Sequence, residues 1–101
     1  AYHAPSDSIL VTYSGNSSIS AHNISTGAQS PASAIYTSAV QLNTPRAIAA
    51  DAAGYIYVGS DGLDQVIKLY WDGVTATATY IGPIIQTSVF TQNITSITVV
   101  P

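Results

Sequence analysis

The chain has 101 residues, of which only 7% are charged, and its formal net charge is −3. Arg46 and Lys68 are its only cations, which excludes a basic surface for nucleic-acid phosphates or anionic lipids. The absence of cysteine excludes disulfides and thiolate metal sites, and no apolar run approaches the roughly 20 residues of a membrane-spanning helix. We therefore expect no nucleic-acid partner and no membrane insertion.

The composition favours an all-β chain. All five acidic residues are Asp, and Ser and Thr together supply about a quarter of the sequence. Glu and Lys are good helix formers, whereas Asp favours turns and caps, so their scarcity argues against surface helices. No stretch has a convincing helical period. A chain of this length forms one domain with a modest core.

The first half predicts three strands after a lead-in, residues 1–7, that contains Pro5. β-branched and alternating apolar runs mark strands, and clusters with Gly, Asn and Pro mark turns. The predicted elements, in chain order, are strand Ser8–Tyr13, a turn at 14–17, strand Ser18–Asn23, a loop at Ile24–Ala32 and a short outer strand at Ser33–Thr37.

The second half predicts a similar succession. After a connector at 41–44, the predicted elements are strand Arg46–Ala50, a tight turn at Asp51–Gly54, strand Tyr55–Gly59, strand Gln65–Trp71, a turn at Asp72-Gly73 and strand Ala76–Ile81, which Gly82-Pro83 ends. Residues 84–90 fit either a strand or an extended connection. The last strand is Ile94–Val100, where apolar and polar residues alternate.

The two halves repeat. Ser8–His22 aligns with Tyr55–Leu69 at a constant offset of 47 residues, so that Ile9 corresponds to Ile56 and Val11 to Val58. A period of roughly 40–50 residues with four strands per unit is typical of β-propeller blades. We predict one domain, 1–101, that contains two propeller-like blades of four antiparallel strands: repeat 1 at about 8–44, repeat 2 at about 45–92, and a terminal strand at 94–100.

Pro45–Trp71 resembles the repeat of NHL-type β-propellers, P-x-G-I-A-x-D-x-x-G-x-I-Y-V followed by a turn and an alternating strand. The matching positions are Pro45, Ile48, Ala49, Asp51, Gly54, Ile56, Tyr57 and Val58. Ala47 stands where the family has glycine, and Ser8–His22 resembles only the second half of the motif. The resemblance covers about two repeats.

The resemblance implies four-stranded blades around a central axis, with apolar faces of adjacent blades packed together. The small residues of Arg46–Ala50 suit a strand near that axis. Members of the family mostly bind proteins, glycans or nucleic acids, and a minority are enzymes with a metal in the central channel.

Two blades do not close a propeller, which needs about four to eight. The terminal strand also lacks a partner blade, and an unpaired strand is a template for pairing with another chain. In one outcome the strand completes a neighbour's blade, in a ring or a filament; its candidate assembly residues are Ile94, Ser96, Ile97, Val99 and Val100. The alternatives are that the chain is part of a longer repeat protein, or that eight strands form a two-sheet β-sandwich.

The sequence contains no convincing catalytic constellation. His3 and His22 are expected to have structural or surface roles, and Asp61–Asp64 lacks the ligands of a complete calcium loop. Asp51 is expected to accept hydrogen bonds from turn amides. No nucleophile elbow or phosphate loop occurs. We therefore predict no enzyme activity, no cofactor and no metal.

Four aromatic residues cluster on one predicted hairpin: Tyr55, Tyr57, Tyr70 and Trp71. Aromatic side chains dominate cores and interfaces alike, and a sugar can stack on such a face. Packing between blades is the favoured interpretation, and a ligand site is the alternative.

Three asparagines lie in glycosylation sequons: Asn16, Asn23 and Asn93. With the low charge, they favour a secreted or cell-surface glycoprotein. The leading hypothesis is a non-enzymatic structural module that associates with copies of itself through strand addition. A glycan-binding lectin module is the second hypothesis, and a propeller enzyme with a channel metal is the least favoured.

Overall fold

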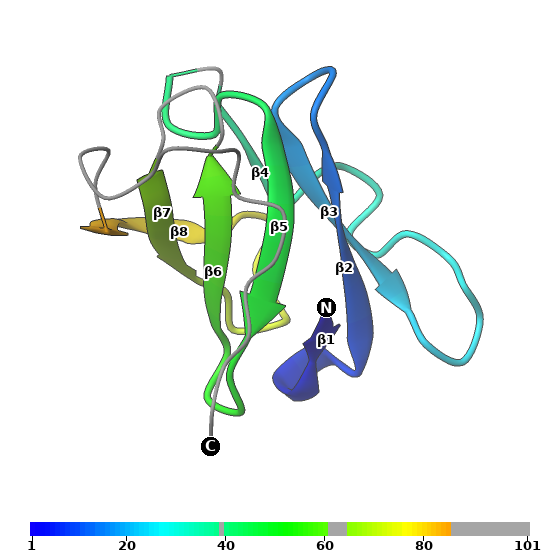
Figure 1. The fold of residues 1–101 in the computed structure, drawn as a ribbon. Coiled ribbons are helices and arrows are strands. Elements are labelled where there is room, and N and C mark those ends of the chain that lie inside the picture. The colour runs from blue at the N-terminus through cyan, green and yellow to red at the C-terminus, as the bar shows by residue number, and fades with distance from the viewer. Residues whose placement is uncertain (39, 61–64, 86–101) are drawn as a thin grey trace.

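The computed structural model of the chain describes residues 1–38, 40–60 and 65–85 (Figure 1). These residues form two antiparallel sheets of four strands each and one short 3₁₀ helix, η1, at Ala4–Ser6. The prediction of an all-β chain with two four-stranded antiparallel sheets is therefore confirmed.

Each sheet is a simple meander in which strands that follow one another in sequence are neighbours. The first sheet contains β1 (Tyr2–His3), β2 (Ser8–Tyr13), β3 (Ser18–Asn23) and β4 (Tyr36–Thr37). The second sheet contains β5 (Pro45–Ala50), β6 (Tyr55–Ser60), β7 (Gln65–Tyr70) and β8 (Thr79–Ile85). The predicted terminal strand, 94–100, lies outside the described residues.

Several elements differ from the sequence prediction: β4 covers only the end of the predicted strand Ser33–Thr37, and β8 begins at Thr79 instead of Ala76. The lead-in contains a strand, β1, whose residues Tyr2 and His3 pair with Ile9 and Ser8. The predicted break at Gly82-Pro83 is wrong, because β8 runs through both residues. A proline is tolerated there because β8 is an edge strand, where a missing N–H faces no neighbour. The ladder to β7 absorbs the irregularity through register shifts at Val66/Ile67 and Lys68/Leu69.

The central hairpins of the two sheets have the same length and register at an offset of 47 residues. β6 and β7 begin and end 47 residues after β2 and β3. Ser8 pairs with Asn23 in the first hairpin, and Tyr55 pairs with Tyr70 in the second. The innermost strands differ, since β1 has two residues and β5 has six.

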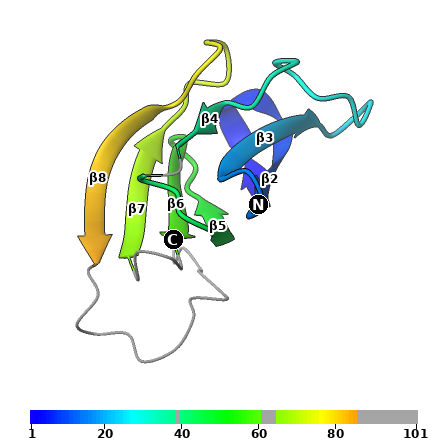
Figure 2. The same ribbon diagram turned by 90° about the horizontal axis from the view of Figure 1, so that it is seen from above.

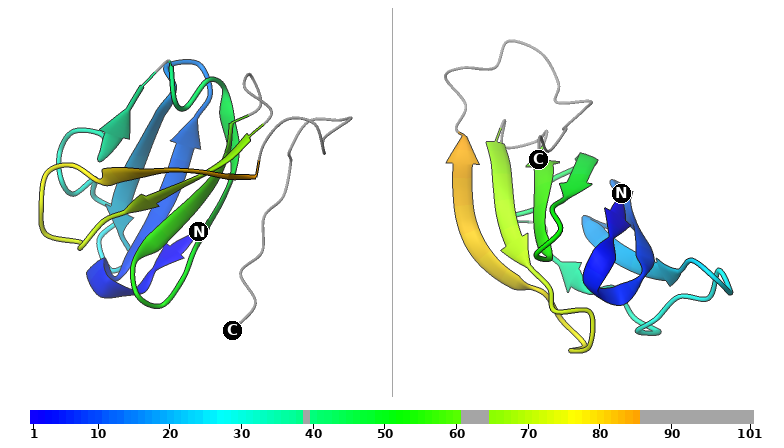
Figure 3. Two further views of the ribbon diagram at one scale, coloured as in Figure 1. Left: turned by 90° about the vertical axis from the view of Figure 1, so that its left-hand side faces the viewer. Right: turned by 90° about the horizontal axis from the view of Figure 1, so that it is seen from below.

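The core lies between the two sheets. Its buried residues include Leu10 and Ala21 from the first sheet, and Ile56, Val58 and Leu69 from the second. Seen from above, the second sheet curves from β8 to β5, and the first sheet lies beyond β5 (Figure 2). The view from below shows the same order: the strands of the second sheet follow one another from orange to green, and the blue strands of the first sheet come next (Figure 3, right).

Hydrogen bonds join the sheets at their inner and outer ends. At the inner end, Thr12 Oγ1 donates to the Arg46 carbonyl at 2.9 Å. At the outer end, the Ala78 N–H donates to the Ile35 carbonyl at 2.7 Å. The rings of Tyr36 and Tyr80 stack beside it with their centroids 6.4 Å apart. The sheets thus meet along β2 and β5 on one side, and through Ile35 and Ala78, the residues just before β4 and β8, on the other.

His3 is a fully buried contact between the sheets rather than part of a loose lead-in. Its Nε2 lies 2.8 Å from the Trp71 carbonyl, which can only accept, so Nε2 carries the proton. Nδ1 lies within hydrogen-bond distance of Ser6 Oγ, at 2.7 Å. The imidazole also lies against the Trp71 ring, with centroids 4.8 Å apart. Both ring nitrogens are satisfied, which makes a buried histidine tolerable.

We predict that Gly54→Ala destabilises the fold by about 1–3 kcal/mol. Gly54 has φ +103°, and an added Cβ would lie 2.8 Å from the Trp71 carbonyl oxygen and 3.3 Å from His3 Nε2. Gly15→Ala is the matched control, because nothing lies within 4 Å of its added Cβ. Urea unfolding should place the control within about 0.5 kcal/mol of wild type. Equal stabilities for the two variants would contradict the close packing at Gly54.

Candidate functional site

The described residues do not assemble a metal centre. No group of three or more His, Cys, Asp or Glu side chains lies close enough among them to hold a metal ion. No helix in this part of the chain has the length and apolar character needed to cross a bilayer.

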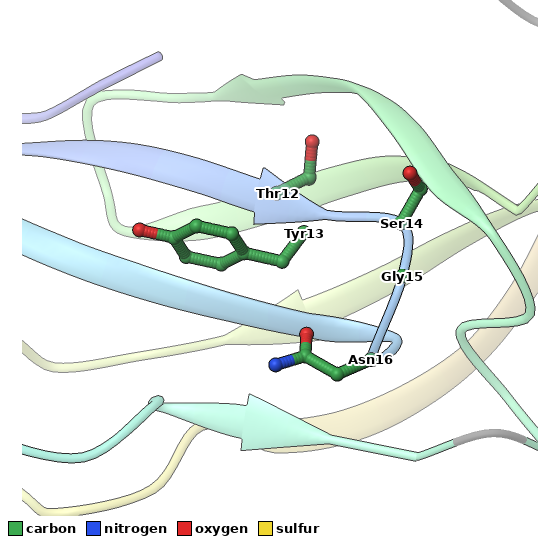
Figure 4. Close-up of a pocket in the computed structure, with 5 residues that line it drawn as sticks. All are labelled: Thr12, Tyr13, Ser14, Gly15 and Asn16. Carbon is green, nitrogen blue, oxygen red and sulfur yellow. The ribbon is translucent and has the colours of Figure 1, made fainter.

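A shallow depression lies at the turn between β2 and β3 (Figure 4). Its lining is the continuous segment Thr12–Asn16, and Tyr13 and Asn16 point to one side of the turn while Thr12 and Ser14 point to the other. No carboxylate, imidazole or amine lines it. The depression therefore does not bring together distant groups of the kind that general acid–base catalysis uses.

Strand alternation gives each sheet one face in the core and one opposite face. We call the opposite face of the first sheet the back face and that of the second sheet the front face. The back face comprises Tyr2, Ile9, Val11, Tyr13, Ser18, Ser20 and His22. The front face comprises Ala47, Ala49, Tyr55, Tyr57, Val66, Lys68 and Tyr70.

The offset of 47 residues shows that the sheets meet through faces that do not correspond. Leu10, in the core, corresponds to Tyr57 on the front face. Conversely, Ile56 and Val58, in the core, correspond to Ile9 and Val11 on the back face. The face that the first sheet buries against the second sheet thus corresponds to the face of the second sheet that points away from the first.

The front face carries a cluster of tyrosines around a lysine. The Tyr55 and Tyr70 rings pair across the strands with centroids 5.0 Å apart. Lys68 Nζ lies 4.4 Å from the Tyr55 ring centroid and 5.8 Å from that of Tyr57, the geometry of cation–π contacts. Ala47 and Val66 are buried beside Tyr57 as a second apolar cluster.

Asp51 fixes the Tyr57 end of this face. Its Oδ1 accepts from the N–H groups of Ala53 and Tyr55, each at 3.0 Å. Its Oδ2 accepts from the Tyr57 hydroxyl at 3.1 Å. Burial and the Asp51 hydrogen bond raise the pKa of Tyr57 above its usual value. Asp51 therefore has the turn-closing role expected from the sequence and holds Tyr57 in place.

The back face exposes large apolar side chains in a row. Tyr2 is 48%, Ile9 37% and Tyr13 43% exposed, and Val11 between them is half-buried. The Tyr2 hydroxyl donates to Asp7 Oδ1 at 2.7 Å, which raises the pKa of Tyr2 and holds its ring beside Ile9. These three side chains make up the exposed apolar part of the back face.

Three of the four aromatic residues singled out in the sequence share the front face. Trp71 does not, because it is only 1% exposed and lies in the core, where its Nε1–H donates to the Thr75 carbonyl at 2.9 Å. Sequence reasoning missed Lys68, although it alternates with Tyr70 on one strand. It also missed the row of Tyr2, Ile9 and Tyr13.

The sequon asparagines differ in their surroundings. Asn16 is exposed, and its Oδ1 accepts from Ser18 Oγ at 2.6 Å, at the tip of the back face. Asn23 is half-buried, and its Oδ1 accepts from the Ser25 N–H at 2.9 Å and closes a turn. Asn93 and the candidate assembly strand, 94–100, lie outside the described residues.

No protein-family model, no curated protein and no solved structure matches this chain. Its function must therefore be inferred from its own residues and from the geometry of its two sheets.

We predict that Asp51→Asn lowers the pKa of Tyr57. Asn keeps an oxygen for the turn amides but removes the negative charge that opposes ionisation of the tyrosine. Because the folded-state pKa of Tyr57 is raised, the free energy of unfolding falls as the pH rises above the unfolded-state pKa and through the folded-state pKa. This loss of stability at alkaline pH should be smaller in the variant. Side-chain carbon NMR of Tyr57 against pH measures the shift.

Asp72→Asn is the control for that titration, because Asp72 binds only its own turn, through the N–H groups of Val74 and Thr75. It should leave the Tyr57 midpoint unchanged. An unchanged midpoint in Asp51→Asn would show that the hydroxyl–carboxylate contact does not hold Tyr57 in solution.

Proposed function

We propose that this chain is a non-enzymatic structural module, secreted or displayed at a cell surface, that works by assembling with copies of itself. One observation carries the proposal: the two sheets, alike in register, meet through faces that do not correspond. This packing leaves the back face of the first sheet at one end of the molecule and the front face of the second sheet at the other.

The pairing of faces that do not correspond decides which two faces remain for contacts with other copies. Two alike sheets that met through corresponding faces would bury the same surface twice, as in a twofold contact. Here the leftover back face corresponds to the core face of the second sheet, and the leftover front face to the core face of the first. Contacts between such unlike faces run head to tail, and they produce rings if the rotation closes and filaments if it does not.

The NHL-type propeller remains our proposal for the architecture. Four-stranded meanders at a constant offset, with β2 of one sheet beside β5 of the other, support it over a β-sandwich. β1 pairs with only two residues of β2, and among the described residues no strand pairs beyond Leu10 on that side, whereas β5 extends along β6. We propose that Ile94–Val100 of another copy adds its backbone there, since an open strand edge accepts one.

The remaining parts of the proposal come from surface chemistry. Asn16 lies on an exposed turn, as a used sequon requires, which supports passage through a secretory route. The low charge leaves apolar and hydroxyl side chains to make contacts. The depression at Thr12–Asn16 gathers no carboxylate, imidazole or amine, which supports a role without catalysis.

Glycan binding is the second candidate, and the front face is the observation that favours it. Tyr55, Tyr57 and Tyr70 share that face with Lys68, and flat aromatic faces with polar edges suit sugar rings. Trp71 has no part in this candidate site, because it is buried.

The 101-residue chain should show a mass above that of its 10.5 kDa monomer, rising with concentration, in sedimentation equilibrium. Because apolar contacts dominate, the association should persist from 0.1 to about 1 M salt, where exposed ion pairs are screened. A monomer at every concentration would reject self-assembly.

A glycan array separates the second candidate. Sugar binding that Tyr70→Ala abolishes, in a chain that stays monomeric, would favour the lectin. Ile24→Ala is the control, since it removes an exposed apolar side chain away from both faces.

A further inference from the structure

We propose that the contact between copies repeats the contact inside the chain: the front face of one copy packs on the back face of the next. This inference rests on the proposed function and names the surfaces that carry it. Its occupant is a second copy of this chain.

The interface inside the chain is the template. Leu10, Ile19 and Ala21 of the first sheet share one buried cluster with residues of the second. The second sheet's contribution includes Ile56, Val58, Ile67 and Leu69. Strands β2 and β5 lie side by side there, joined by the Thr12–Arg46 hydrogen bond. This contact is therefore one that these two surfaces can make.

A shift of 47 residues converts the template into a contact between copies. The counterparts of Leu10 and Ile19 are Tyr57 and Val66, both on the front face, where Tyr57 is half-buried and Val66 is buried beside it. The counterparts of Ile56 and Val58 are Ile9 and Val11, both on the back face. Apolar character is kept at all four positions, so Tyr57 of one copy would lie over Ile9 and Val11 of the next.

The positions that differ make the contact between copies more polar than its template. Ala21 corresponds to Lys68, while Ile67 and Leu69 correspond to Ser20 and His22. Lys68 Nζ lies nearer the Tyr55 ring than the Tyr57 ring, which directs its charge away from the Tyr57–Val66 centre. We therefore expect reversible association, because polar groups at an interface must keep water or find partners.

The test uses two variants that each block one face. Ile9→Lys places a charge on the back face, and Tyr57→Lys places one on the front face. Val74→Lys is the matched control, since Val74 is 89% exposed and outside both faces. Each blocked variant alone should need at least about tenfold more protein to associate than wild type, and the control should behave as wild type.

Mixing the two blocked variants gives the decisive result. Ile9→Lys keeps its front face and Tyr57→Lys keeps its back face, so one good contact remains between them and neither partner can extend it. With one variant ¹⁵N-labelled, native mass spectrometry should show a heterodimer of one copy of each and no larger species. Thermal melts establish that both variants fold; if Tyr57→Lys does not, Tyr70→Lys replaces it, because Tyr70 is on the same face and more exposed.

Three results would overturn the inference, and they differ from failure of the proposed function. A homodimer of either blocked variant at wild-type concentrations would show that copies join through two identical faces, front on front or back on back. If both variants assembled as the wild type does, self-association would stand, but the front and back faces would be rejected as the contact between copies. A wild-type chain that is monomeric, while Tyr57→Lys lowers its melting temperature, would show that the chain covers its own front face, and that result would reject both proposals.

Discussion

The packing of the Leu10 face of the first sheet on the Ile56 face of the second is the contact on which the described structure depends. A four-stranded meander buries little by itself, and it gains stability only when one of its faces is covered. The largest buried cluster among the described residues lies between the sheets, with Leu10, Ile56 and Trp71 among its members. His3 closes the inner end of this layer by binding the Trp71 carbonyl, so even the short β1 is held by it.

Local signals were enough to locate the central hairpins. The predicted bounds of Ser8–Tyr13 and Ser18–Asn23 are those of the structure, because the β-branched apolar run, the Gly-Asn turn and the alternation after it are contained within the segment itself. The β8 prediction failed because a proline ends a central strand but is accepted at a sheet edge, and edge position is a property of the whole sheet. The burial of His3 depends on Trp71, which is far away in sequence.

The candidate site was predictable in part for the same reason. Alternation alone places Tyr55 and Tyr57 on one face of a strand. It does not show that Trp71, one residue beyond the end of β7, turns into the core. The cross-strand register that brings Lys68 beside Tyr57 also requires the assembled sheet. Which face of each sheet meets the other becomes visible only once both are placed.

The unlike pairing of faces gives the molecule a direction. One end presents aliphatic and tyrosine side chains beside Asp7, and the other presents tyrosines around Lys68. A row of copies joined through these faces would be polar in the sense that actin-like polymers are, with a different chemistry at its two tips. A surface that anchors one tip would then orient every subunit behind it, and a molecule that covers the other would decide when elongation stops.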